Sequence, residues 1–136
     1  MLLKSQISVE YMFIIGFATL VSIPLLVIYY TYSSEASDSV STSQAMQIAR
    51  KIVDASESVY YIGKPSQTTL KMNFPENLQV INLSNYEIVI KVKTKNGVTD
   101  VVQISSVNIS GNLSRTPGIH IVTIKAEDKF VNVTSN

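Results

Sequence analysis

The sequence predicts an α+β protein in which a long N-terminal α-helix, hydrophobic and then amphipathic, packs against a C-terminal antiparallel β-sheet or small β-sandwich head. Three observations support this prediction. Residues 11–32 contain no charged side chain. Apolar residues then recur at steps of three and four between residues 40 and 62, which is the period of one helix face. From residue 67 onward the period changes to two and β-branched residues are frequent, which is typical of strands.

The composition excludes several classes of function. Of the 136 residues 15% are charged, whereas about a quarter are charged in a typical soluble protein, so a membrane helix or a buried helix is expected. The formal charge of +1 gives no basic surplus, so nucleic acid is not expected as a partner. The chain has no cysteine and a single histidine, His120, which excludes disulfides, thiolate zinc sites and multi-histidine metal sites. No cofactor is expected.

The uncharged segment 11–32 is long enough to cross a membrane. At a rise of about 1.5 Å per residue, about 20 apolar residues span a hydrocarbon core of about 30 Å. Tyr11 at one end and three tyrosines at the other fit the aromatic residues found at membrane interfaces. No later segment is apolar enough to cross, so one span is predicted. A kink or an opened turn is expected near Pro24, which lacks a backbone N–H.

A secretory signal peptide is the first alternative, because Lys4 precedes the apolar segment. Such a peptide has an apolar core of about 7 to 15 residues and a small-residue cleavage site soon after it. Here the apolar segment is longer, no clear A-x-A pattern follows it, and an acid, Glu10, stands immediately before it. These features disfavour the ordinary signal peptide.

The residues from Lys4 to Tyr11 read K-S-Q-I-S-V-E-Y. Together with the apolar run, they resemble the class III signal peptide of archaeal type IV-like pilins, which is a short basic leader followed by Q-x-S-x-E and a hydrophobic helix. The resemblance covers about the first 32 residues. It implies that a prepilin peptidase cuts between Ser5 and Gln6 and removes a leader of residues 1–5. The family usually has glycine where this chain has Ser5.

The same resemblance implies that Gln6, Ser8 and Glu10 act in assembly. After cleavage the ammonium of Gln6 and the carboxylate of Glu10 both lie at the edge of hydrocarbon, where each charge alone is unfavourable. If Glu10 pairs with the Gln6 ammonium of a neighbouring subunit, the pair also fixes the axial register of helices that enter a filament. The alternative is that Glu10 only marks the end of the membrane span.

Beyond the span the helix is expected to continue, so that it covers residues 6–62. Residues 31–43 include eight Ser or Thr among thirteen and are either a weak helix or a linker. The amphipathic part, residues 40–62, is predicted to bury one apolar stripe against the head. The stripe consists of Val40, Gln44, Ile48, Ile52, Ala55, Val59 and Ile62. Gly63 and Pro65 then stop the helix.

The β-rich head, residues 66–136, is predicted to contain six strands. They are residues 68–74, 78–83, 86–94, 98–107, 119–126 and 129–134. Asn96 and Gly97 form the strongest short hairpin signal, and residues 75–77 and 127–128 mark two further turns, which gives up to three hairpins. Residues 110–118 are expected to form a polar loop.

Catalysis is not expected. His120 lies in the strand-like run 119–122, where a structural role is the simpler interpretation than membership of a hydrolytic triad. The acids of the head occur singly or at turns, as solvated charges do, although composition leaves a glycosidase-type carboxylate pair open. Five scattered glycines give no phosphate-binding loop.

Four N-x-S/T sequons begin at Asn82, Asn108, Asn112 and Asn132. All four lie in the half of the chain that is expected to be extracellular, so these asparagines are candidates for N-glycosylation. The alternative is that Asn, Ser and Thr are simply common on solvent-facing strands and turns.

We therefore expect a pilin, the structural subunit of an archaeal type IV-like pilus or adhesion filament. The resemblance implies four partners: further copies of the chain in a homopolymer, the prepilin peptidase, the pilus assembly platform and, before assembly, the membrane. It also implies a membrane-inserted precursor that later becomes an extracellular filament at the cell surface. Two alternatives stay open: an uncleaved single-pass membrane protein that displays an extracellular β-domain, and an archaellin-like motility subunit. Archaellins resemble this chain in the hydrophobic helix but generally lack the Q-x-S-x-E acid.

Overall fold

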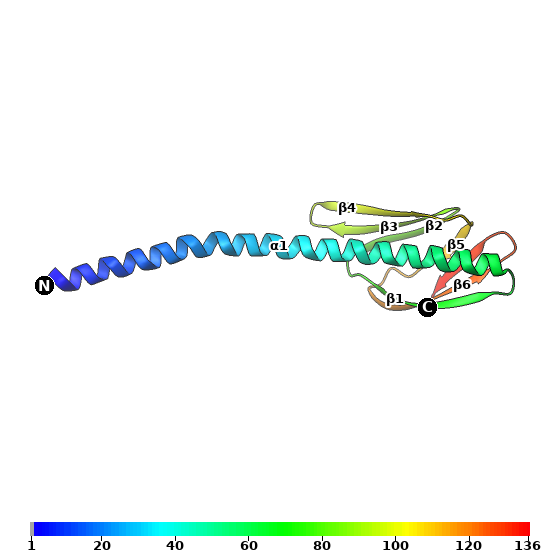
Figure 1. Ribbon diagram of the computed structural model, residues 1–136, viewed down its shortest axis with the longest axis horizontal. Helices are drawn as coiled ribbons and strands as arrows, with labels where there is room; N and C mark the ends of the chain where they lie inside the picture. Colours follow the sequence, from blue (N-terminus) through cyan, green and yellow to red (C-terminus); the bar gives the residue numbers. More distant parts are fainter. Residues whose placement is uncertain (1) are drawn as a thin grey trace. The chain divides into compact units, whose positions relative to one another are not determined.

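The computed structural model describes the backbone from residue 2 to residue 136 and the side chains from Ser8 onward. The chain has an α+β fold, as predicted: one helix, α1 (Leu2–Ile62), precedes the strands (Figure 1). The chain divides into two compact units that meet between Ala36 and Ser37. This boundary falls in the Ser/Thr-rich segment, which is helical throughout, so of the two alternatives the segment is a helix and not a linker.

The unit from Ser37 to Asn136 is the head, and its strands form two sheets. The strands are β1 (Gln67–Phe74), β2 (Leu78–Ser84), β3 (Glu87–Thr94), β4 (Gly97–Ile104), β5 (Ile109–Asn112), β6 (Gly118–Ala126) and β7 (Val131–Ser135). One sheet has the order β1-β6-β7-β5 and the other the order β2-β3-β4. Neighbouring strands are antiparallel except β5 and β7, which are parallel. Because the inner faces of both sheets join one apolar core, the architecture is the sandwich rather than the single sheet.

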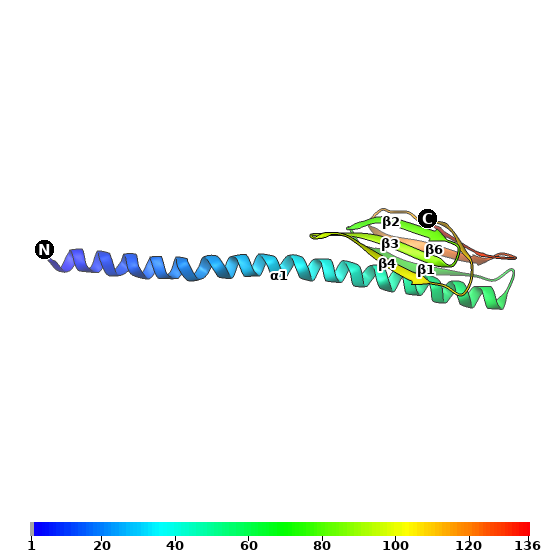
Figure 2. The same ribbon diagram turned by 90° about the horizontal axis from the view of Figure 1, so that it is seen from above.

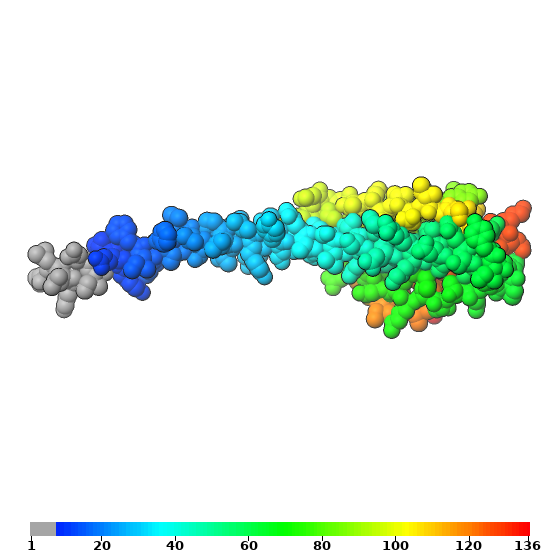
Figure 3. All heavy atoms as spheres, viewed as in Figure 1, coloured from blue at the N-terminus to red at the C-terminus, as the bar shows by residue number. Residues whose placement is uncertain are grey.

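The second half of α1 lies along the head between β4 of one sheet and β1 of the other. Figure 1 shows the helix in front of the strands with these two edges on either side, and the turned view of Figure 2 and the space-filling view of Figure 3 agree. Two helix carboxylates hold the ends of β4. Asp38 Oδ2 accepts a hydrogen bond from the Lys95 backbone N at 2.7 Å. Glu57 Oε1 accepts hydrogen bonds from the backbone N and the Oγ of Ser106 at 2.9 and 2.8 Å.

The buried face of α1 differs from the predicted stripe. The residues with less than a tenth of their surface exposed are Ala45, Ile48, Ala49, Ile52, Val53, Ser56 and Val59. Val40 and Ile62 are 55% and 75% exposed, so these two members of the stripe were predicted wrongly. Val40 stands twelve residues before Ile52, and at about 100° per residue it points about 120° away from the buried face. The small side chains of Ala45 and Ala49 let the helix approach the sheets closely.

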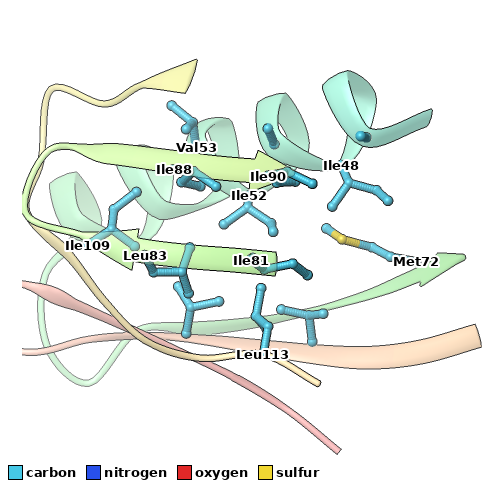
Figure 4. Packing of buried hydrophobic residues seen from close by; sticks show 14 of the residues in the cluster. Ile48, Ile52, Val53, Met72, Ile81, Leu83, Ile88, Ile90, Ile109 and Leu113 are labelled. Carbon is cyan, nitrogen blue, oxygen red and sulfur yellow. The ribbon is translucent and has the colours of Figure 1, made fainter. Parts of the chain in front are cut away.

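The core is a continuous apolar cluster between α1 and the two sheets. Figure 4 shows Ile48 and Ile52 of the helix pointing toward Ile90 of β3. Both sheets and the residue after β5 also contribute to the core, through Met72, Ile81, Leu83, Ile88, Ile109 and Leu113. On β3 the alternate residues Ile88, Ile90 and Val92 are 0% exposed, which is the period of two that the sequence predicts. Each fully buried aliphatic side chain stabilises the fold by about 1.5 to 3 kcal/mol.

Two of the three predicted hairpin turns are confirmed. β3 and β4 pair up to Thr94 and Gly97, and β6 and β7 are joined by residues 127–130, which include the predicted turn at 127–128. The turn at residues 75–77 is not a hairpin, because it leads from β1 in one sheet to β2 in the other. The third hairpin instead joins β2 to β3 through Asn85, whose φ of 55° is a backbone conformation that asparagine tolerates better than most residues.

The predicted polar loop 110–118 contains most of a strand that the sequence does not reveal. Residues Ile109–Asn112 form β5 and pair in parallel with β7. Gly111 has a φ of 153°, and a Cβ at this position would collide with the carbonyl oxygen of Val133. Glycine is therefore required for β5 to approach β7, although Ser, Gly and Asn have low strand propensity.

The hydrogen bonds of Glu57 should stabilise the head less in acid than at neutral pH. Its hydrogen bonds from the backbone N and then the Oγ of Ser106 lower the pKa of its carboxyl from 4.5. An acid whose pKa is lower in the folded state than in the unfolded state stabilises the fold at pH values above its unfolded-state pKa. This stabilisation is lost as the pH falls through the folded-state pKa. In a fragment of residues 37–136, Glu57→Gln should lower the free energy of unfolding by about 1 kcal/mol at pH 7.

The measurement is urea unfolding from pH 7 down to pH 3. The difference between wild type and Glu57→Gln should shrink below pH 4.5, whereas the exposed control Glu76→Gln should show no such trend. A constant difference across this range would mean that the carboxylate charge does not strengthen the contact.

Candidate functional site

The first half of α1 presents an apolar surface that the chain leaves uncovered. Every large apolar side chain from Val9 to Tyr32 is at least 42% exposed. The most apolar window has a mean hydropathy of 2.3 and none of it is buried, unlike the core helix of a soluble protein. By length and composition this is the one helix of the described residues that could cross a membrane. The surface is much larger than the apolar patches found on soluble monomers.

The serine and threonine hydroxyls of this segment are satisfied inside the helix. The hydroxyls of Thr19, Ser22 and Thr31 donate to the carbonyls four residues earlier, at 2.8, 2.7 and 2.9 Å. Such local bonds allow hydroxyls to lie in an apolar environment without a lost hydrogen bond. The helix continues through Pro24 without a break, so the expected opened turn does not interrupt it.

One face of the segment is hollowed around Gly16. The groove measures about 530 Å³ and is lined by Val9, Met12, Phe13, Gly16, Phe17 and Leu20. Their spacing of three and four residues places them on one side of the helix. A Cβ built on Gly16 meets nothing within 4 Å, so glycine leaves an open hollow flanked by larger side chains. A side chain of another apolar helix fits such a hollow in the way knobs fit holes in helix packing.

Glu10 is the only charged residue between Ser8 and Ser34. Its side chain is exposed and makes no ion pair with any residue whose side chain the structure describes. Ser8 is also exposed, and at two residues' separation the two side chains point to different sides of the helix. The predicted cleavage residues Ser5 and Gln6 lie outside the described side chains. The geometry therefore leaves a lone carboxylate at the end of an apolar surface.

The four sequon asparagines lie on the head, as their place in the sequence requires. Asn82 and Asn112 are exposed, and Asn108 and Asn132 are half-buried. Asn82, Asn112 and Asn132 are strand residues, of β2, β5 and β7, while Asn108 precedes β5. Nothing in the sequence pattern reveals this difference in exposure, because all four fit the same motif.

His120 has structural contacts. Its ring stacks on Phe74 with 4.8 Å between ring centroids and 25° between planes. Its Nε2 lies 2.8 Å from the carbonyl oxygen of Thr116, which can only accept, so Nε2 carries the proton and donates it. This pairing supports the structural interpretation of the histidine. No group of three or more His, Asp or Glu that could hold a metal occurs among the described side chains.

The main charge cluster of the head ties the end of α1 to the β6–β7 turn. Lys64 Nζ lies 2.9 Å from Asp128 Oδ2 and 3.2 Å from Glu127 Oε2, and Lys125 Nζ lies 3.2 Å from Glu127 Oε1. Hydrogen bonds to Asp128 and Glu127 raise the pKa of Lys64, and those from Lys125 and Lys64 lower the pKa of Glu127. These surface groups, of which Glu127 is partly buried, fix a turn rather than line a cleft.

The chain matches no protein-family model, and no curated protein or solved structure is significantly similar to it. Its function has to be inferred from its own residues.

Gly16→Leu tests whether the groove receives another helix. The substitution has open space around it and raises helix propensity by about 1 kcal/mol, so the subunit itself should still fold and insert into membranes. Self-association of the full chain should fall at least about tenfold, because the hollow is filled. The measurement is chemical cross-linking in detergent. Ala18→Leu, on the other side of the helix, is the matched control, and equal losses in both variants would contradict the groove as the contact.

Proposed function

We propose that the chain is a pilin, the structural subunit of an archaeal type IV-like pilus or adhesion filament. A prepilin peptidase removes the leader between Ser5 and Gln6, and the subunit then polymerises through the apolar half of α1. The observation that carries the proposal is the uncovered apolar surface from Val9 to Tyr32. It holds a single acid, which has no ion-pair partner among the described side chains, and it is attached to a head with its own core.

The head does not need the apolar half of α1. The members of the core cluster all lie between Ala45 and Val133, and none belongs to the unit that ends at Ala36. An apolar surface of this size that is not used in folding serves association with something apolar. Lipid covers it before assembly, and the helices of neighbouring subunits replace lipid in the filament. The inward-bonded hydroxyls and the Gly16 groove suit both environments.

Glu10 supports the filament over a plain membrane anchor. An anchor that only crosses the membrane gains nothing from a carboxylate at the edge of its apolar surface, because an unpaired charge there is unfavourable. A new terminal ammonium at Gln6 supplies the missing partner. Between subunits, that ion pair stabilises only those helix arrangements in which the two charges meet, and so it selects the axial register.

The proposal is tested first by the N-terminus of the protein from its native cells. The intact mass and the first residue should correspond to a chain that begins at Gln6 and lacks Met1 to Ser5. A chain that keeps Met1 would favour the uncleaved single-pass membrane protein. A chain cut after Tyr32 would favour a secretory signal peptide, and either result would overturn the pilin proposal.

Glu10→Gln should leave the protein expressed and membrane-inserted but poorly assembled. Loss of one partner from a buried ion pair costs about 3 to 5 kcal/mol, which corresponds to a decrease of at least about a hundredfold in subunit affinity. Electron microscopy of cells should therefore show few filaments. Glu35→Gln is the matched control, since Glu35 is the next acid along the same helix, is exposed and lies beyond the apolar surface. Normal filaments with Glu10→Gln would reduce Glu10 to a marker of the membrane boundary.

A further inference from the structure

The sequons of the head gather on one side of the sandwich. β5 pairs with β7, and β2, at the edge of the other sheet, lies beside β5. The parallel register of β5 and β7 places Ser110 opposite Asn132 and Asn112 opposite Thr134. Sequon residues from three segments that are far apart in the sequence therefore share one surface.

This surface, formed by residues 78–84, 108–114 and 131–135, contains no charged side chain. Each of the other four strands of the head carries at least one charged residue, such as Lys71 in β1, Asp100 in β4 and Lys125 in β6. A soluble surface typically has about a quarter to a third charged residues, which keep it hydrated and separate from its neighbours. On this side of the head no charged side chain provides this hydration, and the polar side chains are amides and hydroxyls.

The charge-free surface lies away from α1. The helix runs between β4 and β1, whereas β2 and β5 are the opposite edges of the same two sheets. Bulky groups attached at β2 and β5 therefore do not meet the helix that packs on the head. The packed helix therefore does not cover the exposed residues of the charge-free surface.

Exposure separates the four asparagines into two pairs. Asn82 is exposed on the edge strand β2, and Asn112 is exposed at the end of the edge strand β5. Asn132 is half-buried on β7, between Lys125 of β6 and Ser110 of β5. Asn108 is half-buried beside Phe130, and its carbonyl accepts a hydrogen bond from the Val131 N at 2.8 Å.

We propose that Asn82 and Asn112 carry N-linked glycans that cover the charge-free surface, and that Asn108 and Asn132 stay unmodified. Glycans are bulky and strongly hydrated, so they supply the solvation that charged side chains supply elsewhere on the head. The inference rests on the proposed function only in that the head must lie outside the cytoplasm.

The modification needs a sugar activated by a lipid-linked phosphate and a transferase that reads the sequon. The Asn Nδ2 forms a bond to the anomeric carbon of the sugar, and the bond from that carbon to the phosphate oxygen breaks. The phosphate leaves with the bonding electron pair, and one amide proton passes to a base. Nothing is oxidised or reduced.

The test is peptide mass spectrometry of the full protein purified from its native cells. Trypsin releases residues 72–91 with Asn82, residues 96–115 with Asn108 and Asn112, and residues 130–136 with Asn132. The first two peptides should each carry one glycan, and fragmentation should locate the second glycan at Asn112. The peptide 130–136 should be unmodified.

Variants of the four sequons give the matched controls. Ser84→Ala and Asn112→Gln should each lower the intact mass by one glycan, whereas Ser110→Ala and Thr134→Ala should leave the glycan mass unchanged. A glycan at Asn108 or Asn132, or no glycan at all, would overturn the inference. Protease treatment of intact cells separates the two proposals: an unmodified head that is digested from outside contradicts only this inference, and a head protected inside the cell contradicts the proposed function as well.

Discussion

The structure depends on one constraint, which is that an apolar helix surface has to be covered. Two parts of α1 carry such an apolar surface, and they differ in what covers them. From Ala45 to Val59 its buried face is covered by the two sheets of its own chain. From Val9 to Tyr32 every large apolar side chain is left for something outside the chain to cover. The fold of the head depends on the covered part of α1, and the proposed function depends on the uncovered part.

The head shows how closely a sandwich can depend on a helix. The sheets meet along β2 and β5, and α1 occupies the opposite side, between β4 and β1. The bonds of Asp38 and Glu57 to the two ends of β4 set the position of the helix along that strand. This close fit leaves the Ser56 hydroxyl buried and without a hydrogen-bond partner, at a cost of about 1 to 3 kcal/mol that the surrounding apolar contacts offset.

What could be predicted from the sequence was what local period and turn chemistry determine. The helix end at Ile62, the alternation along β3 and the hairpin at Gly97 each depend on residues close in the chain. What could not be predicted depends on distant contacts. β5 exists because Gly111 lets its backbone approach Val133, and its residues have little strand propensity of their own. The apolar segment and Glu10 were readable as a candidate site, but the groove at Gly16 and the shared surface of the sequons are three-dimensional facts that a linear pattern does not contain.

The Ser/Thr-rich segment from Thr31 to Ser43 has the properties that a helix needs where it leaves an apolar environment. Several of its hydroxyls donate to carbonyls of the same helix, as Ser34 does to Thr31 and Thr42 does to Asp38, both at 2.9 Å. The hydroxyls that donate these bonds therefore do not depend on water for a hydrogen-bond partner. Around its two acids, Glu35 and Asp38, the segment is rich in hydroxyls, which are compatible with lipid head groups, water or a neighbouring helix. In the proposed pilin, such a hydroxyl-rich segment would allow the same subunit to pass from a membrane into a filament without refolding.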